Sequence, residues 1–340
     1  MISKEDVFQI RSKKEFEKVA LKIFRFQFDE NPVYHQFCTL LKKDKNNVKH
    51  LLDIPFLPIQ FFKSHTILSS QNPVEEVFTS SGTSSLATNS VEIIRSKHFV
   101  TDVSIYEKSY QLCFSEFYGN IENYCVLALL PSYLDRDGSS LIYMVNDLIQ
   151  KSNHEDSGFY LDNFEELHQK IKKLHRDGQT ILLLGVTFAL LDFLDYAANQ
   201  GIELKKYGNS IILMETGGMK GKRKELIREE LHQILSEGFG VSKIHSEYGM
   251  TELLSQAYSM GDGIFECPPW MKIIIRDSED ALTYLENGKT GGVCVIDLAN
   301  INSCSFIATQ DLGKKHNNES FEIVGRFDYS DIRGCNLMVV

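Results

Sequence analysis

The residues best suited to chemistry form a short run of hydroxyl side chains. Val77 and Phe78 are typical of the end of a strand, and Thr79-Ser80-Ser81-Gly82-Thr83-Ser84 follows directly. Amide donors, hydroxyls and a glycine that admits close approach suit a loop that wraps a polyphosphate. The loop is not a Walker loop, because the G-x-x-x-x-G-K-[ST] spacing is absent. Taken alone, the run is equally compatible with a Ser/Thr loop that binds nothing.

A second motif lies far downstream, at Tyr248-Gly249-Met250-Thr251-Glu252. Together with the hydroxyl run, it resembles the adenylate-forming superfamily of acyl-CoA synthetases, luciferases and peptide-synthetase adenylation domains. Those enzymes carry a Thr/Ser/Gly-rich phosphate loop first and a Tyr-Gly-x-Thr-Glu motif later. The resemblance implies that both segments bind ATP, that Thr251 contacts the α-phosphate and that Glu252 helps to hold Mg²⁺.

A glycine pair forms a third candidate element. The apolar strand expected at 211–215 ends in Thr216-Gly217-Gly218-Met219-Lys220, ahead of an expected helix from Lys224 to Leu235. Adjacent glycines let a flat ring or a phosphate approach the backbone, although an ordinary strand-to-helix turn explains them too. In the superfamily, a Gly-rich element here packs against the adenine, so Gly217 and Gly218 become candidate ATP ligands.

Two further residues match superfamily motifs near the C-terminus. Thr309-Gln310-Asp311 stands where the superfamily has Thr-Gly-Asp, so Asp311 would accept hydrogen bonds from the ribose hydroxyls. Gln310 departs from that pattern, and a turn residue is the alternative interpretation of Asp311. Gly325-Arg326-Phe327-Asp328 resembles the hinge motif Gly-Arg-x-Asp, so Arg326 would contact ribose or phosphate.

The sequence runs only to Val340, so we expect the superfamily's C-terminal lid domain and its catalytic lysine to be absent. Lys220 is the candidate substitute; a partner could also complete the site, or adenylation could be lost. The segment Asp331-Ile332-Arg333-Gly334-Cys335-Asn336-Leu337 resembles the C-terminal pattern of acyl-protein synthetases, which belong to bacterial fatty-acid reductase complexes. The resemblance implies that Cys335 carries the acyl group as a thioester, and Arg333 beside it could lower the thiol pKa. An incidental cysteine is the alternative.

The resemblance covers about Pro55 to the C-terminus and implies an ATP- and Mg²⁺-dependent ligase. A fatty or other carboxylic acid would become an acyl-adenylate, pass to Cys335 and then to an acyl-accepting protein such as an acyl reductase or a carrier. An acyl-CoA ligase resembling phenylacetate-CoA ligases is one alternative. A non-catalytic subunit that binds nucleotide or a partner is another.

Composition excludes several other classes. The 340 residues carry a formal net charge of -10, which gives no electrostatic footprint for nucleic acid. No apolar run is long enough to span a membrane. The cysteines are odd in number and lack a C-x-x-C pair, which disfavours zinc and disulfides: Cys38, Cys113, Cys125, Cys267, Cys294, Cys304 and Cys335. A cytoplasmic protein is therefore expected.

Strands and helices alternate along most of the chain, which predicts an α/β fold with a largely parallel sheet. Apolar runs predict strands at 126–130, 181–185 and 211–215, and helical spacing predicts helices at 12–28, 97–118, 141–149 and 188–198. Asp162 and Glu165 suggest a capping box for a helix that ends near His175. From residue 261 the strands become short and glycine-punctuated. We therefore expect an α/β adenylate-forming core over 1–260 and a β-rich, barrel-like subdomain with a tail over 261–340.

Overall fold

The structure is a computed structural model, and it describes residues 2–80, 95–131, 138–161, 163–217 and 226–327. Within these residues, one sheet of twelve strands runs through the molecule, and a separate pair of strands lies beside it. The order in the large sheet is β11-β12-β13-β14-β10-β9-β8-β7-β6-β4-β5, with β1 paired to β13. The α/β fold predicted from the sequence is confirmed.

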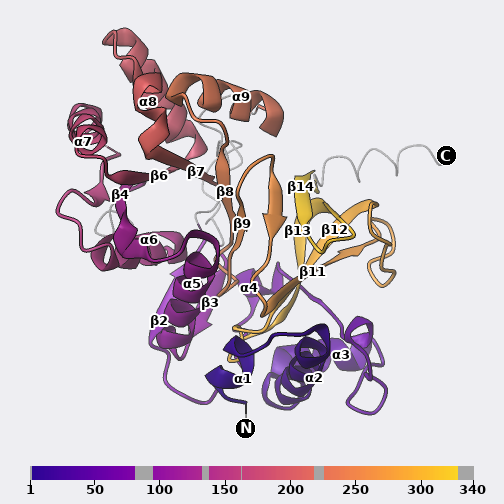
Figure 1. Cartoon of the computed structure of the whole chain (residues 1–340). Coiled ribbons are helices and arrows are strands. Elements are labelled where there is room, and N and C mark those ends of the chain that lie inside the picture. The colour runs from indigo at the N-terminus through magenta and orange to yellow at the C-terminus, as the bar shows by residue number, and fades with distance from the viewer. Residues whose placement is uncertain (1, 81–94, 132–137, 162, 218–225, 328–340) are drawn as a thin grey trace, which may run out of the picture.

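One part of the sheet is parallel. It consists of β5 (Gly158–Phe159), β4 (Tyr124–Leu129), β6 (Thr180–Val186), β7 (Ile211–Thr216) and β8 (His245–Tyr248). Its strands are nearly continuous apolar runs, because helices cover both faces. In Figure 1, α7 (Phe164–Arg176), α8 (Thr187–Asn199) and α9 (Arg228–Phe239) lie on one side, and α5 (Val103–Tyr118) and α6 (Ser140–Lys151) lie on the other. In folds with such a parallel sheet, ligands bind at the loops that follow the carboxyl ends of the strands.

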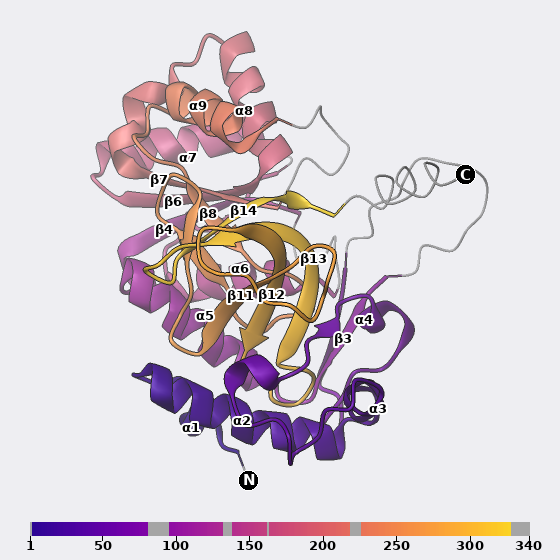
Figure 2. The same ribbon diagram turned by 90° about the vertical axis from the view of Figure 1, so that its right-hand side faces the viewer.

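The other part of the sheet is antiparallel and follows residue 256. It consists of β9 (Ala257–Ser259), β10 (Ile264–Glu266), β11 (Met271–Arg276), β12 (Thr290–Asp297), β13 (Phe306–Lys315) and β14 (Phe321–Arg326). Figure 2 shows β12 and β13 strongly curved. Because β9 pairs with both β8 and β10, hydrogen bonding continues from one part to the other, and the boundary at residue 260 stays a prediction.

Helices near the N-terminus pack beneath the antiparallel strands, as Figure 2 shows. The remaining elements are α1 (Lys4–Phe8), α2 (Lys13–Glu30), α3 (Pro32–Leu40), α4 (Phe61–Ser64), β1 (Leu57–Pro58), η1 (Leu51–Asp53), η2 (Ile121–Asn123) and η3 (Leu204–Ser210). The hydroxyl of Ser12 caps α2 by accepting from the Glu15 amide, and α2 ends at Glu30 with Asn31 as its C-cap, because Pro32 favours extended backbone before it. The Phe24 and Tyr34 rings contact Phe306 of β13.

Three predicted elements need correction. The helix expected over 97–118 begins only at Val103, because Lys97–Val100 forms strand β3, which pairs antiparallel with β2 (Glu76–Thr79). The cap of α7 is Asn163, whose side-chain oxygen accepts from the Glu166 amide, and Asp162 lies outside the described residues. The helix expected over 224–235 continues past Leu235, since its buried face extends to Phe239 and Gly240 caps it at φ +70°.

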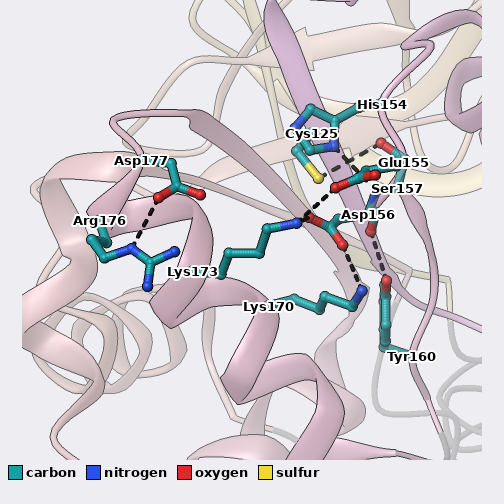
Figure 3. Close-up of polar contacts among 10 residues, drawn as sticks. All are labelled: Cys125, His154, Glu155, Asp156, Ser157, Tyr160, Lys170, Lys173, Arg176 and Asp177. Carbon is teal, nitrogen blue, oxygen red and sulfur yellow. Dashed lines mark hydrogen bonds and ion pairs between the residues drawn. The ribbon is translucent and has the colours of Figure 1, made fainter.

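A charged cluster attaches α7 to the outer edge of the parallel strands (Figure 3). The carboxylate of Asp156 is only 2% exposed and accepts hydrogen bonds from Lys170 and Lys173 of α7, the latter at 2.7 Å. Lys173 also contacts Glu155, and the Tyr160 hydroxyl donates to the Asp156 carbonyl at 2.6 Å. Burial raises the pKa of Asp156, but the two lysines outweigh it, so the net pKa is lowered and the carboxylate is charged.

Candidate active site

The hydroxyl-rich run begins where the β2–β3 pair ends, at Thr79 opposite Lys97. The Thr79 amide donates to the Gly138 carbonyl at 2.7 Å, and the Ser80 amide donates to the Ser96 carbonyl at 3.1 Å. The Ser96 amide in turn donates to the Ser80 hydroxyl at 3.0 Å. These bonds hold Ser80 and Ser96 together on either side of residues 81–94, which lie outside the described residues. The predicted ligands Ser81, Gly82, Thr83 and Ser84 lie outside the described residues.

Three predicted residues from distant parts of the chain meet at one carboxylate. The Tyr248 hydroxyl at the end of β8 donates to Asp311 Oδ2 at 2.8 Å, and Arg326 Nε of β14 donates to Asp311 Oδ1 at 2.9 Å. Asp311 and Arg326 are also cross-strand neighbours in β13 and β14. Asp311 is buried, whereas the Arg326 side chain is 69% exposed. Burial, and then the charge of Asp311, raises the pKa of Tyr248, so the phenol is the donor. The carboxylate is held in a fixed orientation with lone pairs left for further donors.

Glu252 lies beside Ser96, close to the start of the hydroxyl-rich run at Thr79 and Ser80. It is only 6% exposed, and the Ser96 side chain lies beside its carboxylate. Burial raises the pKa of Glu252, although Ser96 and the charges of Lys63 and Arg326 act in the opposite direction. The two motifs that carry the superfamily resemblance are therefore in contact through Ser96. Thr251 precedes Glu252 in the loop after β8 and is partly buried.

Gly249 and Met250 complete the motif between Tyr248 and Thr251. A Cβ atom at Gly249 would lie 2.4 Å from Glu247 Oε1, so any larger residue here would have to displace the Glu247 carboxyl. Met250 is partly buried against the hydrophobic core. Glycine thus lets the backbone of the motif pass directly beside the Glu247 carboxyl.

Glu247 is a residue that sequence reasoning missed. Its Oε2 accepts a hydrogen bond from the Thr216 hydroxyl at 2.6 Å, across the β7–β8 pair. Burial raises its pKa to about 7, although the Thr216 hydrogen bond lowers it. The sequence feature that could have identified Glu247 is its place directly before the Tyr-Gly-x-Thr-Glu motif, where a carboxylate lies within a strand.

The first glycine of the predicted adenine-binding pair directly follows β7. Gly217 adopts φ +67°, and its carbonyl accepts from the Thr187 hydroxyl of α8 at 2.8 Å. The same hydroxyl lies 3.4 Å from Glu215 Oε2, and Glu215 Oε1 lies 3.7 Å from His232 Nε2 of α9. These contacts hold the strand end, and φ > 0 explains the glycine at position 217. Gly218 and Lys220 lie outside the described residues.

The predicted nucleophile Cys335 also lies outside the described residues. The other six cysteines are free thiols, and five of them are buried. Burial raises the pKa of Cys125 to about 11 and of Cys38 and Cys294 to about 12, and it also raises the pKa of Cys113, Cys267 and Cys304. A nucleophilic thiol needs a lowered pKa, so these six are poor candidates.

The described residues contain neither a clustered metal site nor a membrane-spanning helix. No group of three or more His, Cys, Asp or Glu side chains in this part of the chain could hold a metal ion. Glu252 is a buried carboxylate, and carboxylates of this kind can hold Mg²⁺ together with substrate phosphates. None of the helices in the described ranges is long and apolar enough to cross a bilayer.

Comparisons with known proteins agree with the resemblance noted in the sequence. The family model described as "Acyl-protein synthetase, LuxE" matches residues 6–340. A long-chain-fatty-acid–luciferin-component ligase of Vibrio harveyi is 24% identical over 330 residues, which cover 92% of this chain and 84% of the relative. A protein of the same name from Aliivibrio fischeri is 23% identical over 341 residues, or 94% of this chain and 86% of the relative.

Solved structures share the fold. A 2-hydroxyisobutyryl-CoA ligase in its postadenylation state, in complex with 2-HIB-AMP, gives a TM-score of 0.65 at 11% identity, over 95% of this chain and 70% of that one. ATP-bound MatB from Rhodopseudomonas palustris gives a TM-score of 0.54 at 16% identity, over 76% of this chain and 49% of that one. At these identities the likeness is evidence for the fold alone.

Proposed function

Because this chain belongs to the acyl-protein synthetase family described as LuxE, we propose that it activates a fatty acid with ATP and passes the acyl group to a protein. The observation that carries the proposal is the family match over residues 6–340, nearly the whole chain. The closeness of the two motifs supports it, since Ser96 is hydrogen-bonded to Ser80 of the first motif and lies beside Glu252 of the second. The substrate class follows the names of the two Vibrio and Aliivibrio relatives.

In the first step, a carboxylate oxygen of the acid attacks the α-phosphorus of ATP. The bond from that phosphorus to the oxygen bridging the α- and β-phosphates breaks, and pyrophosphate leaves. The work of the protein is to position the reactants and to stabilise developing charge. The amides and hydroxyls of residues 79–84 would bind the phosphates, and Thr251 would contact the α-phosphate.

Asp311 is suited to hold the ribose of ATP. Tyr248 and Arg326 fix its two oxygens, and the remaining lone pairs can accept from the ribose hydroxyls. The exposed Arg326 side chain is free to contact a phosphate as well as Asp311. Gly217 and Gly218 would admit the adenine, and Lys220 is the candidate cation for the step.

Glu252 would hold Mg²⁺ together with the ATP phosphates. When bound, the ion neutralises phosphate charge. Binding needs the charged form of Glu252, and burial raises its pKa. The carboxylate therefore gains from a cation more than an exposed one would, because its charge is otherwise unfavourable there.

In the second step, the thiolate of Cys335 attacks the acyl carbonyl carbon. The bond from that carbon to the AMP oxygen breaks, AMP leaves, and the thiol proton passes to solvent. A thiol of an acyl-accepting protein, such as an acyl reductase or a carrier, then takes the acyl group by thioester exchange. We expect these steps to occur in the cytoplasm.

Acyl loading tests the proposal directly. The protein is incubated with ATP, Mg²⁺ and a long-chain fatty acid, and its intact mass is measured. We expect a gain equal to the mass of one fatty acid less one water molecule, reversed by hydroxylamine. Cys335→Ala should abolish the gain while pyrophosphate exchange persists. Cys267→Ala is the matched control, since Cys267 is a thiol of raised pKa, and it should load normally.

Two results would overturn parts of the proposal. Loading that survives Cys335→Ala would remove the role of that cysteine. Release of acyl-CoA from added coenzyme A, with no acyl-protein at any time, would make the protein an acyl-CoA ligase instead.

A further inference from the structure

His98 is a buried polar residue that joins the two motifs of the candidate site. It lies in β3, two residues after Ser96, and is 1% exposed. Its Nδ1 lies 2.9 Å from the Thr251 carbonyl oxygen, and its Nε2 lies 3.0 Å from Asn300 Oδ1. The edge of its ring packs against Phe62, with ring centroids 5.7 Å apart. Strand β3 therefore contacts Thr251 through His98, and Ser96 directly before the strand contacts Ser80.

The hydrogen-bond roles at His98 follow from its two neighbours. Both facing atoms are acceptors, because Asn300 Nδ2 is already engaged in donating to the Glu252 carbonyl at 2.8 Å. Burial lowers the pKa of His98 to about 4, although both contacts raise it, so the ring is neutral at neutral pH. A neutral imidazole carries one hydrogen and can donate to only one of the two oxygens.

We assign that hydrogen to Nδ1, because the position of the Thr251 carbonyl depends on His98 more than the position of Asn300 does. Asn300 is anchored independently of His98, since its backbone carbonyl accepts from Gln27 Nε2 at 2.9 Å and its amide holds the Glu252 carbonyl. The Thr251 carbonyl lies in a loop after β8, where no ladder partner holds it. Leaving this partly buried carbonyl without a donor costs about 1 kcal/mol or more.

We propose that His98 is a positioning residue. It donates from Nδ1–H to the Thr251 carbonyl and so holds Thr251 and Glu252 in place beside Ser80 and Ser96. This inference rests on the proposed function, in which both segments handle the same triphosphate. Ser96, directly before β3, and His98 within β3 then both contact the motif. Loss of the hydrogen bond from His98 would leave ATP binding largely intact and would displace Thr251 from the α-phosphate.

A pair of substitutions separates the two nitrogens of the ring. His98→Asn places an amide donor near the position of Nδ1, and His98→Gln places one near Nε2. We expect His98→Asn to keep the turnover of pyrophosphate exchange within about threefold of wild type. His98→Gln should lower it about 100-fold, because a misplacement near 1 Å has an effect of that size, while KM for ATP changes less than about threefold.

The outcomes are decisive in both directions. Equal turnover in the two variants, or a loss confined to KM, would overturn the proposal. Long-range ¹H–¹⁵N NMR of the wild-type ring provides a test that needs no variant: a hydrogen on Nδ1 is expected, and a hydrogen on Nε2 would refute it. If wild type itself shows no exchange with any acid, the proposed function fails, while the NMR result still judges the hydrogen bond.

Discussion

The partly buried carboxyl of Glu247 leads to a prediction about stability and pH. Its pKa is raised by burial from the ordinary value of 4.5 to about 7. In the unfolded chain the group ionises near its ordinary value, whereas in the folded protein it stays protonated until about pH 7. The folded state therefore binds one more proton across this window, so stability falls as pH rises through it.

The magnitude follows from the width of the window. One pH unit is worth about 1.4 kcal/mol for a single group. Over the interval from 4.5 to about 7, wild type should therefore lose about 3 kcal/mol of unfolding free energy because of Glu247 alone. Glu247→Gln cannot ionise, and its amide oxygen can still accept from the Thr216 hydroxyl. The variant should match wild type near pH 4.5 and exceed it by about 3 kcal/mol above pH 7.

Urea unfolding at a series of pH values measures this difference. Glu266→Gln is the control, because Glu266 is exposed at the end of β10, and its curve should run parallel to that of wild type. If the difference between Glu247→Gln and wild type does not change with pH, the reasoning is refuted. A variant less stable than wild type above pH 7 would refute it as well.

Two further predictions concern other carboxylates. Asp311→Asn keeps one acceptor oxygen for two donors, Tyr248 and Arg326, so the ribose-binding role predicts an ATP dissociation constant raised about 10- to 100-fold in calorimetry; unchanged affinity would contradict that role. Asp156→Asn should lower the unfolding free energy by about 1–3 kcal/mol, since the partly exposed lysines can rehydrate. Because the pKa of Asp156 is lowered in the folded protein, its contribution should begin to fall below its ordinary value of 3.8 and be lost as the pH falls through the lower folded pKa; a difference that stays constant in acid would argue against it.

Much of the fold was predictable from local pattern. The strand at Thr180–Val186 is a continuous apolar run, and the structure buries it between helices on both faces. The pairing of Asp311 with Tyr248 and Arg326 could be anticipated only through family resemblance, because no periodicity links residues that lie 15 and 63 positions apart. Their meeting depends on the register of β13 and β14.

The errors have a physical cause. Lys97–Val100 was assigned to a helix because Phe99 continues the apolar spacing of Val103 and Tyr106, and a four-residue strand has too little pattern to compete. Its strand conformation comes from pairing with β2. His98 and Glu247 could not be identified for a similar reason, since their properties arise from neighbours such as Asn300 and Thr216, which only the folded chain brings near.

Pyrophosphate exchange into ATP tests the central claim most directly. The protein is supplied with ATP, Mg²⁺ and labelled pyrophosphate, across carboxylic acids from short aryl to long alkyl. The account predicts exchange that depends on long-chain acids and that survives Cys335→Ala. Folded protein that gives no exchange with any acid would contradict it, because reversible formation of an acyl-adenylate cannot occur without exchange.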